Sequence, residues 1–279
     1  MTEPRSGRPR RGRGPLLLLS AAAIAFVGAI CGIGGGLFAV PLLHYVFRLG
    51  LRATVATSLC LVWANALAST GAELLHAESA FEWRVVLPLV GGALVGAQFG
   101  YLASIRLPQR AIKGIFAAVM AAAGLRLLLA ASGSAEGTAF PIEYGVPRAS
   151  AVAAIGVLAG AASPLLGIGG GLIVVPGILL VLPELGMLGA RAAALGNAVV
   201  TSSRSIQLYA KEGAIDWKLA RWIVVGAFAG ATLGVQVVHL EGAAALGRSA
   251  LSFLLVVTAL RMGWDVVRMG RGGAAASSP

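Results

Sequence analysis

The sequence predicts an all-α integral membrane protein built from two copies of one helical unit. Three observations support this: the composition, the length of the apolar stretches and an internal repeat. Of the 279 residues, 58% are hydrophobic and 12% are charged, against about 25% charged residues in an average soluble domain. Apolar stretches of roughly 20 residues recur, and each is long enough to cross a hydrocarbon core of about 30 Å. Lipid is therefore the expected solvent for most of the chain.

A ten-residue motif near the N-terminus recurs in the second half of the chain. GIGGGLFAVP at 32–41 returns as GIGGGLIVVP at 167–176, and the two positions that differ stay apolar. Further pairs, such as Arg-Ala and later Trp-Arg or Trp-Lys, follow both motifs in the same order. We therefore predict repeat 1 at 15–131 and repeat 2 at 149–268. They are joined by a polar linker, 132–148, which holds Gly, Ser, Glu and Pro.

Each repeat contains four apolar blocks. They are 15–47, 52–75, 84–105 and 110–131 in repeat 1, and 149–184, 190–210, 217–239 and 246–267 in repeat 2. The first block of each repeat is too long for one ordinary span and too short for two. A glycine cluster, which is costly inside a helix, interrupts it. We therefore expect each repeat to have a glycine-broken or re-entrant leading segment, followed by three spanning helices.

The distribution of lysine and arginine predicts the orientation of the repeats. The net charge of +11 comes partly from five arginines in the N-terminal tail, 1–14, which indicates a cytoplasmic tail rather than a nucleic-acid binder. If each leading segment returns to its own side, most basic loops join this tail in the cytoplasm. Three spans per repeat would then invert repeat 2 relative to repeat 1, and inverted repeats place substrate at their interface. The C-terminal tail, 269–279, is expected to be disordered and cytoplasmic.

The two glycine motifs, each followed by a helix that opens with Arg-Ala, resemble the sulfite exporter TauE/SafE family, also called the 4-toluene sulfonate uptake permease (TSUP) family. The resemblance covers nearly the whole chain except its tails. It implies a permease of the bacterial inner membrane for small sulfur-containing anions or organic acids. Repeat 1 has the Thr-Ser pair usual in the family at Thr57 and Ser58, whereas repeat 2 departs from it with Gly196 and Asn197.

The glycine clusters are the first candidates for an anion site. Successive glycines let the backbone approach a ligand closely, and exposed N–H groups at a helix start bind anions. The prolines that follow keep the next segment from completing an ordinary helix. The alternative is that the glycines only allow tight helix crossing; we favour ligand binding because the motif occurs twice beside a helix break. The candidates are Gly34, Gly35, Gly36 and Pro41 in repeat 1 and Gly169, Gly170, Gly171 and Pro176 in repeat 2.

Polar residues on the second helix of each repeat are the other candidates. At about 100° per residue, several of them share one helix face. The candidates are Thr57, Ser58 and Asn65 in repeat 1 and Asn197, Thr201 and Arg204 in repeat 2. In the register of the Arg-Ala pairs, Ser58 matches Asn197 and Asn65 matches Arg204. Arg204 would supply a positive charge for an anion; the alternative is that its side chain extends to the water near the helix end.

Other features are interpreted as structural. Small residues recur four positions apart in the third apolar block of each repeat: Gly96 and Gly100, Gly230 and Gly234. This spacing predicts a helix-packing seam. We interpret Arg52 and Arg191, which precede the second helices, as anchors at the headgroups, the alternative being recruitment of anions.

No enzyme, metal or cofactor signature is present, because the three histidines lack ligand-like spacing and the two cysteines lie in apolar surroundings. The sequence indicates no proton relay built from buried carboxylates. We therefore expect a permease for a small anion, sulfite or an organosulfonate. The alternatives are a permease for another small organic acid and a non-transporting membrane subunit that serves a soluble sulfur-metabolism partner. The expected partners are the lipid bilayer, the anionic solute and a second copy in a homodimer.

Overall fold

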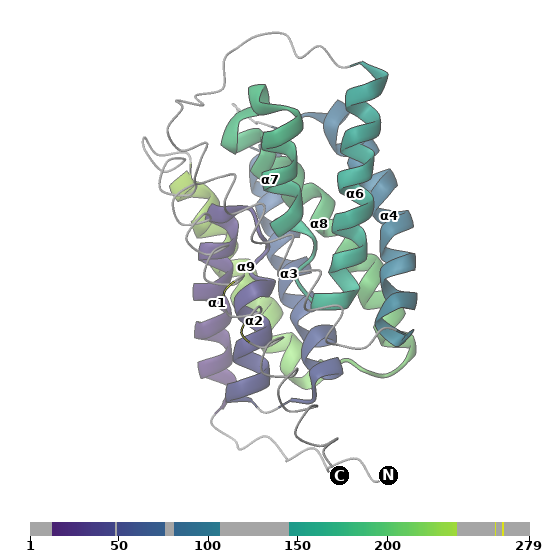
Figure 1. The fold of residues 1–279 in the computed structure, drawn as a ribbon. Coiled ribbons are helices and arrows are strands. Elements are labelled where there is room, and N and C mark those ends of the chain that lie inside the picture. Colours follow the sequence, from purple (N-terminus) through teal and green to yellow (C-terminus); the bar gives the residue numbers. More distant parts are fainter. Residues whose placement is uncertain are drawn as a thin grey trace.

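A computed structural model describes residues 13–47, 49–75, 81–106 and 145–238, together with Leu260 and Trp264. The fourth apolar block of repeat 1, most of that of repeat 2, most of the linker and nearly all of both tails therefore lie outside the described residues. Within the described residues the chain forms helices and no strands, as Figure 1 shows.

The helices of the two repeats follow the same order. In repeat 1 they are α1 (Arg13–Cys31), α2 (Gly36–Pro41), a π-helical turn (Leu42–Val46), α3 (Leu51–Leu75) and α4 (Trp83–Arg106). In repeat 2 they are α6 (Val146–Leu166), α7 (Gly171–Val181), a 3-10 turn (Pro183–Leu185), α8 (Gly186–Lys211) and α9 (Trp217–Val238). The predicted apolar blocks match these helices to within a few residues. The largest difference is the start of α8, which begins at Gly186 where the block was predicted from 190. The start of α6 takes in the last three residues of the predicted linker, where Pro147 suits a first helical turn.

Five of the described helices, α1, α3, α4, α6 and α9, are long and apolar enough to cross a membrane. A sixth span would be formed by α7 and α8 together, which are bent by 109° at the break between them. These lengths confirm the predicted class, an all-α multi-pass membrane protein. They also show that α1 and α6 each have the length of a span without the short helix that follows.

The break in each leading segment is at the glycine cluster, as predicted. Three glycines of each cluster have positive φ angles between 69° and 78°: Gly32, Gly34 and Gly35, and Gly167, Gly169 and Gly170. L-residues with a side chain rarely adopt this left-handed conformation. The glycines therefore end α1 and α6 and turn the chain into α2 and α7.

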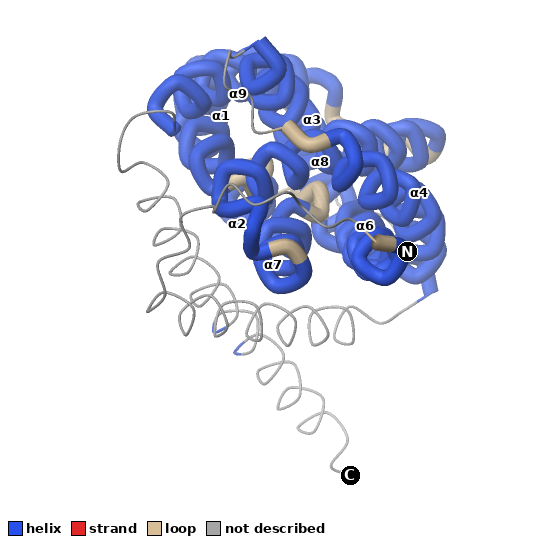
Figure 2. Tube along the Cα trace, turned by 90° about the horizontal axis from the view of Figure 1, so that it is seen from above, coloured by secondary structure: helices blue, strands red, loops and turns tan. Residues whose placement is uncertain are grey.

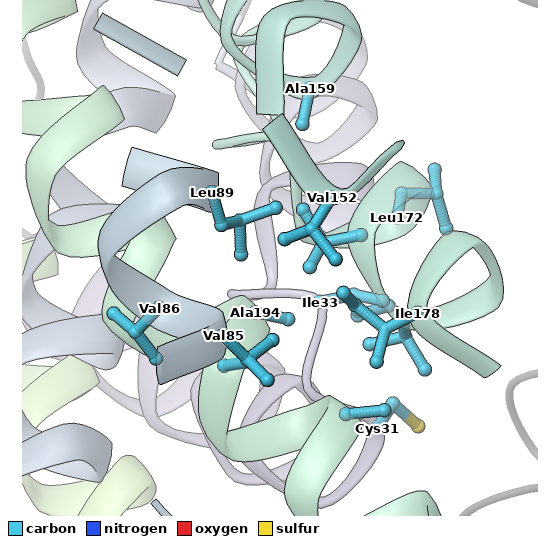
Figure 3. Packing of buried hydrophobic residues seen from close by; sticks show 14 of the residues in the cluster. Cys31, Ile33, Val85, Val86, Leu89, Val152, Ala159, Leu172, Ile178 and Ala194 are labelled. Carbon is cyan, nitrogen blue, oxygen red and sulfur yellow. The ribbon is translucent and has the colours of Figure 1, made fainter. Parts of the chain in front are cut away.

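The two repeats are interleaved rather than side by side. Figure 2 shows α3 and α8 in the middle of the bundle, with α1 and α9 on one side and α4 and α6 on the other. The leading helix of each repeat thus packs against the third described long helix of the other repeat. A buried apolar cluster also crosses between the repeats: Ile33, from the break of repeat 1, lies beside Ile178 of α7 and Ala194 of α8 (Figure 3). The repeats therefore share their core and form one domain.

The small residues of α4 and α9 form the predicted packing seams. A Cβ atom added at Gly96 would overlap the carbonyl oxygen of Val157 in α6, and one added at Gly230 would overlap the carbonyl oxygen of Ala22 in α1. Close approach of backbones is how helices associate where no water is available to drive them together.

Replacing Gly96 with alanine is expected to lower the free energy of unfolding by about 1–3 kcal/mol, because the added methyl group forces α4 and α6 apart. The control is Gly91→Ala in the same helix, where a Cβ would meet nothing within 4 Å. Thermal unfolding of the purified proteins can be followed with a thiol-reactive dye, since both cysteines, Cys31 and Cys60, are buried and free. Equal melting temperatures of the two variants would contradict the packing role.

Candidate functional site

The two glycine breaks contact each other across the interface of the repeats. A Cβ atom added at Gly36 would lie 2.7 Å from the Cα of Ile168, and one added at Gly171 would lie 2.7 Å from the carbonyl oxygen of Gly32. The contacts are reciprocal, because each break touches the equivalent part of the other. Close backbone contact, rather than conformation alone, is what requires glycine at Gly36 and Gly171.

Hydroxyl groups of α3 and α8 hold carbonyl groups of the break in repeat 2. The hydroxyl of Ser58 in α3 lies within hydrogen-bond distance of two carbonyl oxygens, that of Val55 in its own helix at 2.8 Å and that of Gly167 at 3.0 Å. Thr201 in α8 donates to the carbonyl oxygen of Gly169, also at 3.0 Å. Both side chains are fully buried. Two of the predicted polar residues are therefore brought to the glycine turn, where their visible role is to fix its carbonyl groups.

Two asparagine side chains are buried without their full set of partners. Asn197 in α8 is fully buried, and neither Oδ1 nor Nδ2 of its amide has a hydrogen-bond partner among the described residues. Asn65 in α3 is also fully buried; its Oδ1 accepts from Ser69 at 3.1 Å, but its Nδ2 has no partner there. A Cβ at Gly28 would lie 2.7 Å from that nitrogen. Buried polar atoms are normally satisfied, so each exception requires an explanation, and a bound solute is one.

The other predicted site residues outside the glycine clusters have different contacts from these asparagines. Arg204 is partly exposed and donates to Gln98 at 2.9 Å, so its side chain reaches the neighbouring helix α4. Thr57 is buried and its hydroxyl accepts from the backbone N–H of Asp216 at 3.3 Å. Pro176 is buried within α7, and Pro41 is the last residue of α2. The structure therefore does not place Arg204 beside Asn65, its match in the repeat.

A buried ion pair was missed in the sequence analysis. Arg191 in α8 and Glu73 in α3 are both buried and form an ion pair with each other. The interpretation of Arg191 as a headgroup anchor is therefore wrong. The internal repeat contains a pattern that could have indicated the pairing. Arg52 and Arg191 are 139 positions apart, and so are Glu73 and Glu212. Arg52 pairs with Glu212.

The sequence of this chain is similar to those of known membrane proteins. The profile of the family described as sulfite exporter TauE/SafE matches residues 2–127 and 152–278, which correspond to the two repeats. A probable membrane transporter protein of Xylella fastidiosa strain 9a5c is 30% identical over 224 residues, covering 77% of this chain and 81% of that protein. Its counterpart from strain Temecula1 is 28% identical over 255 residues, covering 88% of this chain and 93% of that protein.

A probable membrane transporter protein of Paramagnetospirillum magneticum is similar to a shorter part of the chain. It is 37% identical over 105 residues, which is 36% of this chain and 16% of that protein. No solved structure matches the chain. The profile match to both repeats and the coverage of the Xylella proteins show that this chain is a membrane transporter of the sulfite exporter TauE/SafE family.

Proposed function

We propose that this transporter carries a small anion, with sulfite or an organosulfonate as the substrate class, across the bacterial inner membrane. The binding site lies between the two glycine breaks and the central helices α3 and α8. The observation that carries the proposal is the Asn197 amide, which is fully buried with both polar atoms unpaired among the described residues. Leaving such a group unsatisfied costs about 1–3 kcal/mol, and a solute that returns in each transport cycle would offset that cost.

The available groups suit an oxyanion. The amide N–H groups of Asn197 and Asn65 are donors. The hydroxyl protons of Ser58 and Thr201 are instead shared between carbonyl oxygens of the break and of their own helices. The start of α7 at Gly171 adds N–H groups without helical partners and the positive end of a helix dipole. Sulfite and sulfonate oxygens accept such bonds. Neutral donors hold an anion less tightly than a buried guanidinium would, which favours release.

Inversion of the repeats is part of this proposal. Arg52, at the start of α3, pairs with Glu212, just after the end of α8, while Glu73, near the end of α3, pairs with Arg191 near the start of α8. The equivalent helices α3 and α8 are therefore antiparallel. This supports two repeats of opposite orientation, with substrate bound at their interface. The cytoplasmic location proposed for both termini depends on the distribution of lysine and arginine.

Asn197→Ala is expected to abolish uptake of labelled sulfite into proteoliposomes while changing the melting temperature little, because the lost amide has no hydrogen-bond partner among the described residues. The matched control is Ser58→Ala, the equivalent position in repeat 1. That variant loses a hydrogen bond to Gly167 and is expected to lose about 1 kcal/mol of stability. Full uptake by the Asn197→Ala protein would remove this residue, and with it the proposed site, from consideration.

Competition identifies the substrate class. Unlabelled sulfite and short organosulfonates are expected to inhibit uptake of labelled sulfite by the same protein, and short carboxylates much less. Stronger inhibition by a carboxylate would show that the site binds organic acids instead. A protein that binds none of these solutes and moves none of them would contradict the permease proposal for this class of anion.

A further inference from the structure

Two ion pairs join the repeats at equivalent positions. Arg52 of repeat 1 pairs with Glu212 of repeat 2, and Arg191 of repeat 2 pairs with Glu73 of repeat 1. The arginines correspond to each other in the repeat, and so do the glutamates, each at an offset of 139 residues. Each pair therefore connects one repeat to the other, and the repeat that supplies the arginine in one pair supplies the glutamate in the other.

The two pairs lie at opposite ends of the central helices. Arg52 is in the first turn of α3 and Glu73 in its last turn, 21 residues later. At 1.5 Å per residue this separates them by about 32 Å, close to the thickness of a hydrocarbon core. One pair therefore lies near each membrane surface, if α3 crosses the bilayer as its length and composition indicate.

The surroundings of the two pairs are very different. The side chains of Arg191 and Glu73 are 1% and 0% exposed, whereas those of Arg52 and Glu212 are 60% and 27% exposed. Arg191 also donates to the carbonyl oxygen of Ala29 near the end of α1, at 3.3 Å. Its aliphatic part packs against Gly32, where a Cβ would lie 2.7 Å from its Cγ. The buried pair thus seals α1, α3 and α8 together at its end.

The equivalent end of α6 is held by a different group. Ala29 corresponds to Pro164 in the repeat, and the carbonyl oxygen of Pro164 accepts from the hydroxyl of Tyr209 at 2.7 Å. Arg52, the counterpart of Arg191, has an exposed side chain and pairs with Glu212. The carboxylate of Glu212 also accepts a hydrogen bond from the hydroxyl of Tyr101. Repeat-related ion pairs therefore occupy two different environments in one structure: the Arg191–Glu73 pair is buried and the Arg52–Glu212 pair is exposed.

We propose that the two ion pairs are the gates of an alternating-access cycle and that they exchange environments during transport. Closing the Glu212 end buries Arg52 and Glu212, and opening the Glu73 end exposes Arg191 and Glu73 to water. This inference rests on the proposed transport function. Separating a buried ion pair without water is very costly, whereas an exposed pair contributes little. The Arg191–Glu73 contact therefore breaks only when its end of the bundle admits water.

If the two ion pairs are gates, weakening one of them is expected to change the accessibility of the two ends in opposite directions. Weakening one gate shifts the population toward the conformation that is open at that end, and so closes the other end. Two contacts with a purely structural role would not behave in this way. Their removal would loosen the bundle at both ends, or at neither. Opposite changes at the two ends are therefore the signature of gating.

The test measures accessibility at both ends with single cysteines. Cys31 and Cys60 are replaced by alanine, and one reporter is introduced at a time: Ala56→Cys or Leu195→Cys. These buried positions correspond in the repeat and lie one turn beyond Arg52 and Arg191 on the same face. The rate of labelling by a membrane-impermeant maleimide is then measured in the full-length protein without any substrate.

The Glu73→Gln variant is expected to raise the labelling rate at Leu195→Cys about tenfold and to lower it at Ala56→Cys. Glu212→Gln is expected to do the reverse, with a change of about threefold because the pair is exposed. Exchanging the charges, Arg191→Glu with Glu73→Arg, should return labelling toward the level of the unmodified pair. Glu212→Gln alters an exposed group, so this variant is expected to fold. It alone can therefore test for an increase of the labelling rate at one reporter and a decrease at the other, even if Glu73→Gln does not fold.

Labelling that changes in the same direction at both reporters, or at neither, would overturn the proposal. The outcome is independent of the substrate. If the two reporters respond in opposite directions but no anion is moved, the gates stand and the proposed substrate is wrong. If Asn197→Ala abolishes uptake but the reporters respond together, the binding site stands and the gates are wrong.

Discussion

Replacing Arg191 with methionine is expected to lower the free energy of unfolding by about 3–5 kcal/mol, enough to leave little folded protein in the membrane. The substitution leaves the carboxylate of Glu73 fully buried without its arginine. It also removes the donor to the carbonyl oxygen of Ala29. Methionine fills much of the same volume, so the loss comes from removing the positive charge beside the buried carboxylate and not from a cavity.

The matched control is Arg52→Met, the same chemical change at the equivalent position. Its side chain is exposed, and an exposed ion pair contributes about 0.2–1 kcal/mol, so this variant should unfold at nearly the temperature of the unmodified protein. A double variant, Arg191→Met with Glu73→Gln, removes both charges and should recover much of the loss. Thermal unfolding followed through the buried thiols measures all three. Equal losses for the two arginines would contradict the burial argument.

Adding a methyl group at Gly36 is expected to abolish both uptake and stable folding. Its Cβ would overlap the carbonyl oxygen of Gly167 and lie 2.7 Å from the Cα of Ile168 and the Cγ2 of Val62. Two of these neighbours are backbone atoms of the opposite break, which cannot move aside without displacing α7. The cost is expected to be about 3 kcal/mol, at the upper end of what overpacking a core produces.

Gly171→Ala should behave in the same way, because its Cβ would meet Gly32 and Ile33 in the reciprocal contact. Gly71→Ala in α3 is the control, since a Cβ there meets nothing within 4 Å and alanine favours a helix by about 1 kcal/mol over glycine. Yield of folded protein and sulfite uptake are the measurements. Normal uptake by Gly36→Ala would show that the breaks separate in the membrane and do not touch.

Much of the fold could be predicted because it depends on local chemistry. Glycine clusters inside apolar segments predict breaks, and the positive φ angles of the breaks confirm them. Small residues four apart predict close helix crossing, and the seams along α4 and α9 confirm it. The partner of each seam was not predicted, because the spacing of Gly96 and Gly100 describes one helix face and not the helix that covers it.

The candidate site was predicted less completely. Helix periodicity placed Ser58, Asn65, Asn197 and Thr201 on inward faces, and all four are buried. The same reasoning placed Arg204 in the same predicted site, although its side chain donates a hydrogen bond to Gln98 of another helix. A long arginine side chain reaches several neighbours, and the choice among them depends on which helices surround it.

The sequence by itself determined that this chain is a membrane protein of two repeats, where its helices run and where each leading helix breaks. These properties depend on hydropathy, helix length and the conformational freedom of glycine, which act over a few adjacent residues. Only the tertiary structure decided that the repeats interleave and that Arg191 meets Glu73, 118 positions away. It also decided that Asn197 is buried without a partner among the described residues. A long-range contact depends on how antiparallel helices are brought together, and no local pattern specifies that.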